Sequence, residues 1–188
     1  RHEAPIIIIP DDLVEGEVVI IMSGLIPNRK SHPMVHRWFG VSFLEGEFYE
    51  ISSFESVLER TKLGRKSIPN PAEKIDEKPF KALLPEAIKQ AGLWMHDQRQ
   101  SFEDKINEKL NIQIKALDRL RDKQYVYLDS KYQSSRISES RLKEQKDSEK
   151  RSIDKIFDEY YKWVEDTMTT EDQPYLQIVA VFIGKTKS

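Results

Sequence analysis

The chain has 188 residues, of which 38% are apolar and 33% charged, and its formal net charge is −2. This length suits one domain or one domain with an extension, and the near-neutral charge argues against wholesale adhesion to nucleic acid while leaving local patches open. The absence of cysteine excludes disulfides and thiolate chemistry, and apolar runs such as VVIIM are too short to cross a bilayer, so no membrane contact is expected.

Residues 1–52 are expected to form β-structure. The run EVVIIMSGLI is rich in β-branched residues and is closed by Gly24 and Pro27. The runs WFGVSFL and EFYEIS flank Glu45-Gly46, which predicts a β-hairpin. The residues that would alternate onto one face of this hairpin are Phe39, Val41 and Phe43.

A short helix is expected after the hairpin. Ser52 and Glu55 have the capping-box spacing, and Gly64 would end the helix. The residues that would face inward are Phe54, Val57 and Leu58. The next stretch, RKSIPNPAEKIDEKP at 65–79, contains three prolines and predicts an irregular connection.

Residues 80–173 are predicted to form a long helical hairpin. Pro85 is expected in the first turn of the first helix, and Gly92 is the point where that helix would be interrupted. Apolar residues spaced by three and four predict the packed faces of two antiparallel helices of about 40 and 33 residues. The two stripes are Phe102, Ile106, Leu110, Ile114, Leu117 and Leu120, then Ile153, Phe157, Tyr160, Val164 and Met168. The serine-rich stretch YLDSKYQSSRIS between them is the expected reversal.

The C-terminal segment 174–188 contains YLQIVAVFI, a continuous apolar run of strand length. Such a run is typical of a strand that is covered on both faces. The GKT that follows resembles the end of a phosphate-binding loop, but Val179 stands where that loop requires a glycine. We therefore interpret GKT as the polar exit of a buried strand.

These elements together predict an α+β fold. A helical hairpin returns the chain to its starting point, so the last strand can pair with the first ones. We expect a small mixed or antiparallel sheet built from both chain ends, with a long antiparallel, coiled-coil-like helical hairpin protruding from it. The expected organisation is a β-rich part with one short helix and a proline-rich connection at 1–79, the hairpin at 80–173 and the returning strand at 174–188.

The densest candidate site is IPNRKSHPMVHRWFG, residues 26–40, which contains no acidic residue. Its cations would neutralise phosphates and its tryptophan would stack on a base, which favours a nucleic-acid contact. The alternative, and the commoner case, is a loop with solvated cations whose tryptophan anchors the next strand. The candidate residues are Arg29, Lys30, His32, His36, Arg37 and Trp38. The two histidines are four residues apart, but Pro33 separates them and no third ligand is near, so no metal is expected.

The hairpin carries two basic rows, each of which shares one helix face. They are Lys115, Arg119 and Lys123 on the first helix, and Lys143, Lys146 and Lys150 on the second. A duplex lying along these rows is one interpretation, and a solvated helix face interleaved with acidic residues is the commoner one. Between 154 and 166 the second helix has five carboxylates against two lysines, so the arm would orient on a charged partner.

No constellation typical of an enzyme is found. His96-Asp97 is half of a phosphohydrolase metal motif, and a nucleophile elbow, a glycine-rich phosphate loop and a Glu/His pair at ligand spacing are all missing. We expect no catalytic residue and no cofactor in this chain.

Several stretches taken together resemble a known group of proteins. They are PNRKSHPMVHRWFGV, LGRKSIPNP, PEAIKQAGLWM and FDEYYKWVEDTMTTEDQPYLQIVAVFIG. This set resembles the C-terminal accessory region of bacterial Swi/Snf-type, superfamily-two helicases, and the resemblance covers nearly the whole chain. It implies a non-catalytic, cytoplasmic module of a nucleic-acid-dependent ATPase that contacts DNA, RNA or a partner subunit. It also implies that ATP and Mg²⁺ bind only in the RecA-like lobes of the parent protein, outside this sequence.

A rival hypothesis needs no nucleic acid. In it the chain is a protein–protein interaction arm that acts through the helical hairpin. The apolar stripes would pair within one chain or between two, so self-association through the helices belongs to this hypothesis. The first residue is Arg rather than Met, which we interpret as the start of a segment from a longer protein.

Overall fold

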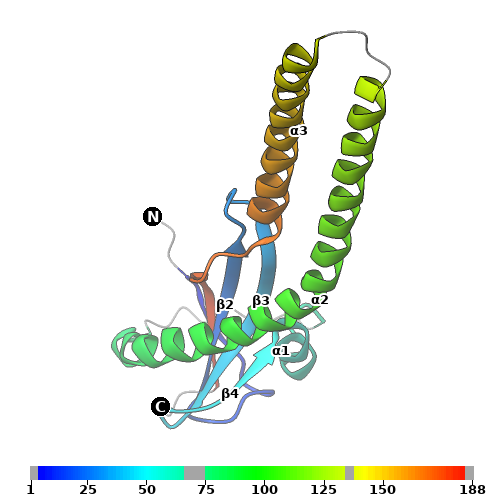
Figure 1. The fold of residues 1–188 in the computed structure, drawn as a ribbon. Helices are drawn as coiled ribbons and strands as arrows, with labels where there is room; N and C mark the ends of the chain where they lie inside the picture. Colours follow the sequence, from blue (N-terminus) through cyan, green and yellow to red (C-terminus); the bar gives the residue numbers. More distant parts are fainter. Residues whose placement is uncertain (1–3, 66–74, 134–137, 185–188) are drawn as a thin grey trace. The chain divides into compact units, whose positions relative to one another are not determined.

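The computed structural model describes residues 4–65, 75–133 and 138–184, which form strands and helices in a β-β-β-β-α-α-α-β order (Figure 1). The elements are β1 (Ile6–Ile8), β2 (Glu17–Pro27), β3 (Pro33–Leu44), β4 (Glu47–Ser53), α1 (Phe54–Thr61), α2 (Lys78–Gln133), α3 (Glu139–Met168) and β5 (Tyr175–Ile183). The chain divides into two compact units. The sheet unit comprises residues 1–27, 33–100 and 170–188, and the helical unit comprises residues 28–32 and 101–169.

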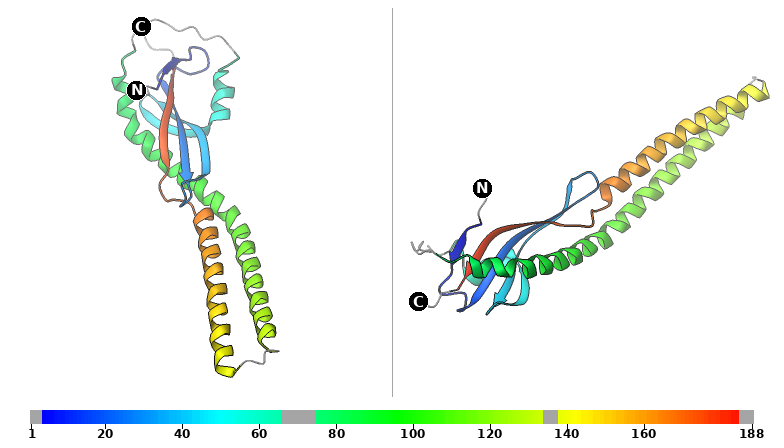
Figure 2. Two further views of the ribbon diagram at one scale, coloured as in Figure 1. Left: turned by 90° about the horizontal axis from the view of Figure 1, so that it is seen from above. Right: turned by 90° about the vertical axis from the view of Figure 1, so that its left-hand side faces the viewer.

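The sheet is built from both ends of the chain, as predicted. Its strand order is β1-β5-β2-β3-β4, with β1 parallel to β5 and all other neighbours antiparallel. The last strand, β5, lies beside β2 from the pair Val18–Ile183 to the pair Leu25–Tyr175 (Figure 2). The α+β fold with a mixed sheet is therefore confirmed. Only the second half of β5 is buried, because β1 is short and flanks β5 only there.

The prediction that Gly24 closes the first long strand is wrong, since β2 continues to Pro27. Gly24 lies inside the strand at a point where α2 comes very close. A Cβ atom at this position would lie 2.5 Å from Sδ of Met95. The glycine therefore makes room for a helix rather than ending a strand.

The hairpin predicted around Glu45-Gly46 is confirmed. Both turn residues have positive φ, 50° and 87°, as a tight reversal requires. Phe39, Val41 and Phe43 are all 0% exposed, so they do share a buried face. The description of residues 26–40 as a loop is wrong, because β3 already begins at Pro33 and only residues 28–32 form a turn.

The short helix α1 is present, but its first cap differs from the prediction. Ser53, not Ser52, is the N-cap, and its Oγ accepts a hydrogen bond from the main-chain N–H of Ser56. The helix ends with Lys62 in the left-handed conformation, two residues before Gly64. Although the helix begins and ends at other residues than predicted, Val57 points into the core, where it is 0% exposed.

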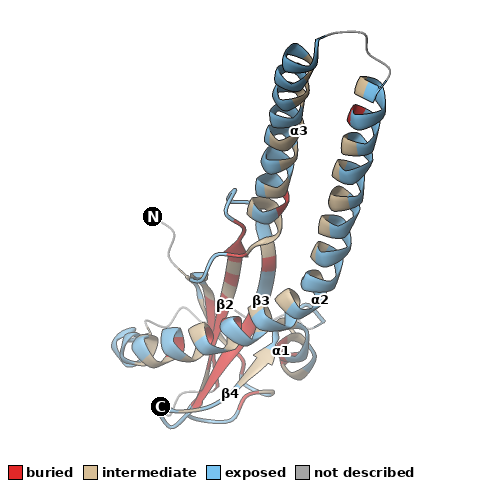
Figure 3. Ribbon diagram, in the orientation of Figure 1, coloured by how far each residue is buried: buried red, intermediate tan, exposed pale blue. Residues whose placement is uncertain are grey.

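The sheet is covered on both faces over part of its length. On one face a cluster forms around α1 and the segment before β2, and its members are Ile9, Leu13, Val19, Ile21, Val57, Ala180 and Phe182. On the other face lies the N-terminal part of α2, whose Ala87, Ala91 and Met95 are 0% exposed. The ring of Trp94 lies 4.5 Å from that of Phe39. Figure 3 shows that buried residues gather on the strands, as expected for a two-sided sheet core.

The first long helix is longer and more continuous than predicted. α2 has 56 residues and α3 has 30, against the expected 40 and 33 or so. Pro85 lies inside α2 rather than in its first turn, and Gly92 does not interrupt the helix. Pro85 removes the helical donor to the carbonyl of Lys81, which is an exposed residue. The predicted reversal spans residues 127–138; residues 127–133 still belong to α2, and 134–137 lie outside the described residues.

Within the helical unit, α2 and α3 run antiparallel and are joined by polar contacts. The hydroxyl of Tyr161 donates to Asp118 at 2.7 Å, the hydroxyl of Tyr125 donates to Asp154, and Lys131 Nζ lies 2.7 Å from Glu149 Oε1. From one contact to the next, the residue number increases along α2 and decreases along α3, as it does in an antiparallel helix pair.

Two residues of the predicted stripes point outward. Leu120 is 50% exposed and Tyr160 is 55% exposed, so both predictions of packed positions are wrong. Tyr125, Leu128 and Tyr161 lie on the paired faces instead. The hydroxyl groups of the two tyrosines reach carboxylates on the opposite helix, which apolar periodicity does not reveal.

Candidate interaction surfaces

The turn between β2 and β3 is organised by Asn28, which is 1% exposed. Its Oδ1 accepts hydrogen bonds from the main-chain N–H groups of Lys30 and His32, both at 2.9 Å. Its Nδ2 donates to the carbonyl of Thr167 at 2.7 Å, near the C-terminal end of α3. One asparagine therefore forms the turn and also satisfies a carbonyl that the end of the helix leaves open.

Two of the predicted nucleic-acid ligands, Arg29 and Lys30, lie at the same helix end. A guanidinium nitrogen of Arg29 is 3.1 Å from Glu165 and 3.9 Å from Asp166, and Lys30 Nζ is 5.8 Å from the ring centroid of Trp163. The last turn of α3 contains no basic residue of its own. The two cations compensate the partial negative charge of this helix end, so their charge already has partners within the chain.

The other predicted ligands do not join this pair. His32 is exposed, and its main-chain N–H bonds to Asn28. Arg37 has its Nε 3.4 Å from Oε1 of Gln98, and it also donates to the carbonyl of His36 at 3.0 Å. The six predicted residues therefore form no single convergent site.

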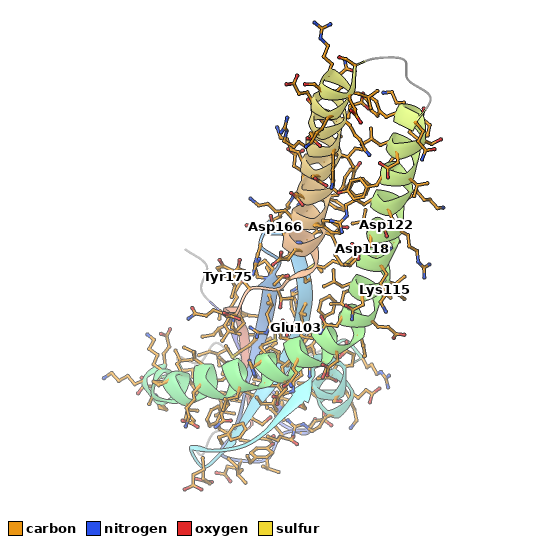
Figure 4. The ribbon with its side chains drawn as sticks, in the orientation of Figure 1. Glu103, Lys115, Asp118, Asp122, Asp166 and Tyr175 are labelled. Atoms are coloured by element: carbon orange, nitrogen blue, oxygen red, sulfur yellow. The ribbon has the colours of Figure 1, made fainter. Side chains whose placement is uncertain are left out.

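His36 and Trp38 do come together, on an open sheet face. The register places His36 and Tyr175 on either side of Leu25, and places Trp38 opposite Ser23. Residues directly opposite each other in a sheet project from the same face. The residues of this open sheet face are Ser23, Leu25, His36, Trp38, Tyr175 and Gln177. Figure 4 labels Tyr175 at the start of β5.

The open sheet face combines exposed rings with hydrogen-bonding groups. Tyr175 is 69% exposed and Trp38 is 42% exposed. Helix α1 covers one end of this face, where the ring centroids of Phe54 and Trp38 are 5.6 Å apart. The indole N–H of Trp38 donates to Nε2 of His36 at 3.2 Å, and the hydroxyl of Ser23 lies 3.0 Å from the same nitrogen. Since an indole N–H only donates, Nε2 of His36 is the acceptor of this hydrogen bond. The sequence analysis did not predict Tyr175 as part of a site, because its strand partner, Leu25, is more than a hundred residues away in the chain.

The two basic rows of the helices differ in their surroundings. Lys115, Arg119 and Lys123 on α2 are all exposed (Lys115 is labelled in Figure 4). On α3, Lys143 is exposed, but Lys146 lies 2.7 Å from Asp129 and Lys150 lies 5.3 Å from the ring of Tyr125. The second row therefore contributes mainly to the contact between the helices.

A second apolar stripe, absent from the sequence prediction, lies on the outside of each helix. On α3 the outer stripe consists of Ile156, Tyr160 and Trp163, which are 53%, 55% and 55% exposed. On α2 the outer stripe consists of Ile112, Leu120, Val126 and Tyr127, which are 50–69% exposed. These exposed apolar residues are visible in the sequence, but a prediction of one packed stripe per helix does not account for them.

A buried polar cluster joins three elements of the sheet unit. Glu17, which is 5% exposed, accepts hydrogen bonds from the Tyr49 hydroxyl at 2.5 Å and the Val14 N–H at 3.1 Å, and lies 2.9 Å from Arg60. Burial, together with the hydrogen bond to Glu17, raises the pKa of Tyr49. The cluster ties β2, β4 and α1 together.

Comparisons with known proteins find no relative. No family model matches the chain, and no curated protein or solved structure matches it either. The resemblance to helicase accessory regions therefore stays a prediction. Within residues 4–65, 75–133 and 138–184, no three His, Asp or Glu side chains are grouped as metal ligands require. None of the helices in this part of the chain is long and apolar enough to cross a membrane.

Proposed function

We propose that this chain is a protein-docking module whose helical unit provides the contact surface. The observation that carries the proposal is the outer stripe of α3. Ile156, Tyr160 and Trp163 are spaced by four and three residues, so they line one face of the helix, and each is more than half exposed.

This stripe lies outside the face through which α3 packs against α2, and Lys30 of the β2–β3 turn contacts its Trp163. α3 already packs against α2 through a different face, so a second apolar face leaves large side chains in water. Such faces in a folded protein mark interaction sites, and Trp and Tyr are the residues most often found at the energetic centre of an interface. The surface suits the apolar face of a partner helix.

The proposal is tested by photocrosslinking in cells of the source organism. A photoreactive phenylalanine analogue replaces Tyr160 in the outer stripe, and in a control chain it replaces Glu59 on the exposed side of α1. We expect a defined protein adduct at position 160 and none at position 59. Equal adducts at both positions, or no adduct at 160, contradict the proposal.

The open sheet face favours a second candidate function, which is contact with single-stranded nucleic acid. His36 and Trp38 on β3 and Tyr175 on β5, the two strands that flank β2, present three rings on one face, and exposed rings on a sheet are platforms on which bases stack. The contact would serve the accessory role in a cytoplasmic, helicase-type ATPase that the sequence resemblance implies.

This second candidate is tested by fluorescence anisotropy with labelled single-stranded oligonucleotides over a salt series. We expect Tyr175→Ala to weaken binding by about 1–3 kcal/mol, as the loss of one stacked base does. Tyr127→Ala is the matched control, because Tyr127 is equally exposed but lies on α2. A wild-type chain without salt-dependent binding removes this candidate.

A further inference from the structure

We infer that the open sheet face prefers adenine among the bases of a single strand, and that Gln177 sets this preference. The inference rests on the second candidate function, contact with single-stranded nucleic acid. The hydrogen-bonding groups of this face include a set bound to one another and a side-chain amide without a partner, and the two have different consequences for a bound base.

Ser23, His36 and Trp38 form the bound set. Nε2 of His36 accepts the indole N–H of Trp38 at 3.2 Å and lies 3.0 Å from the hydroxyl oxygen of Ser23. These contacts hold the indole in one orientation, so its ring is a prepared surface for a stacked base. They also engage the only donor of the Trp38 side chain, so Trp38 offers a base its ring face rather than a hydrogen bond.

Gln177 lies on the same face, and its amide is not engaged. It stands directly opposite Ser23 in the pairing of β2 with β5, and it is exposed. In the described part of the chain, no group donates to its amide or accepts from it. Gln177 follows Tyr175 by two residues along β5, a spacing of about 7 Å, so the amide lies beside a base that stacks on the Tyr175 ring.

A glutamine amide presents a donor beside an acceptor, and adenine matches this pattern on two edges. Its N6 amino group and N7 form two hydrogen bonds with a glutamine, and N6 repeats the pattern with N1 on the Watson–Crick edge, which a single strand leaves open. Guanine shows two acceptors, N7 and O6, on the first of these edges. A pyrimidine shows a donor beside an acceptor on its Watson–Crick edge alone. Adenine can therefore meet Gln177 in more orientations on the ring than any other base.

The test is fluorescence anisotropy of the full chain with two labelled single strands of equal length. One strand carries adenine at each position, and the other carries unsubstituted purine, which keeps both rings and N7 but lacks the N6 amino group. We expect the wild type to bind the adenine strand at least about fivefold more tightly, since the purine strand loses the two-bond contact.

Two variants show whether Gln177 is responsible. Gln177→Met keeps a side chain of similar length and removes the amide, so it should bind both strands with equal affinity. Gln113→Met makes the same chemical change at an exposed position of α2 and should keep the wild-type ratio of affinities.

Three results count against the inference, and only one of them reaches the candidate function. A wild type that binds both strands equally overturns the preference for adenine and leaves the stacking contact standing. A Gln177→Met chain that keeps the wild-type ratio, although circular dichroism shows it to be folded, overturns the role of Gln177. A wild type that binds neither strand removes the inference together with the second candidate function.

Discussion

At the scale of single residues, two glycines of the sheet unit have contrasting surroundings. A Cβ atom at Gly40 would lie 2.8 Å from Val19 Cγ1 and 2.8 Å from Val57 Cγ2. Both neighbours are β-branched and 0% exposed, so they cannot turn away. A Cβ atom at Gly92, inside α2, would meet nothing within 4 Å. The same added methyl group therefore has opposite effects at the two positions.

We expect Gly40→Ala to lower the free energy of unfolding by about 1–3 kcal/mol, because it overpacks the core. We expect Gly92→Ala to raise it by about 0.5–1 kcal/mol, because alanine restricts the unfolded chain and favours the helix. Chemical denaturation followed by circular dichroism measures both. Equal effects at the two positions would show that the space around the glycines does not decide the outcome.

Asn28 provides a second prediction at this scale. Asn28→Ala removes two hydrogen bonds within the turn and one to Thr167, so we expect a loss of about 1–3 kcal/mol in the free energy of unfolding. His32→Ala is the control, since the observed hydrogen bond from His32 to Asn28 uses its main chain only. Thermal unfolding of both variants decides the matter, and an Asn28→Ala chain as stable as His32→Ala would contradict the role given to Asn28.

At the scale of elements, the pairing of α2 with α3 depends on tyrosine–carboxylate contacts. The hydrogen bond to Asp154 raises the pKa of Tyr125, and the hydrogen bond to Glu149 raises that of Tyr132. Burial, with the hydrogen bond to Asp118, raises the pKa of Tyr161. All three phenols must stay protonated to donate these hydrogen bonds.

Because the pKa of each of these tyrosines is higher in the folded state than in the unfolded state, the protonated phenols stabilise the fold, and this stabilisation is lost at alkaline pH. The contribution is complete below the ordinary tyrosine value of 10.0 and is lost as the pH rises through the higher folded-state pKa. We expect the helical signal at 222 nm to fall between about pH 10 and pH 12. A chain with Tyr125, Tyr132 and Tyr161 all replaced by Phe should show a flatter profile. Identical profiles for the two chains would mean that these contacts do not stabilise the helix pair.

At the scale of the whole molecule, the two compact units depend on different parts of the chain. The sheet unit needs both chain ends, because β5 pairs with β1 and β2 and Phe182 belongs to its core cluster. The helical unit is held by contacts within residues 28–32 and 101–169. Damage to one unit should therefore spare the other.

We expect a chain in which a short flexible linker replaces residues 129–145 to keep its sheet. The contacts Tyr125–Asp154 and Tyr161–Asp118 remain in that chain, and nothing in the sheet is touched. A chain that ends before Tyr175 loses β5 and should fail to form the sheet core. Amide hydrogen exchange in β2 and β3 measures both results. Loss of protection in the shortened chain would show that the sheet depends on the distal half of the helix pair.

The fold could be predicted where the local pattern and the global arrangement agree. The hairpin around Glu45-Gly46 and the pairing of β5 with the first long strand follow from apolar alternation and from the return of an antiparallel helix pair. The candidate site was harder to predict. Of the six candidate residues in segment 26–40, His36 and Trp38 lie together on the open sheet face, whereas the turn that carries Arg29 and Lys30 binds to the end of α3.

The sequence by itself determined which segments are strands and helices, since those depend on periodicity and on side-chain shape over a few residues. Only the tertiary structure decided which partner each polar group finds. Gly24 became a strand interior because Met95 packs on it, and Tyr161 rather than Tyr160 turned inward because Asp118 accepts its hydroxyl. Such choices depend on atoms far apart in the chain, and a local pattern holds no information about them.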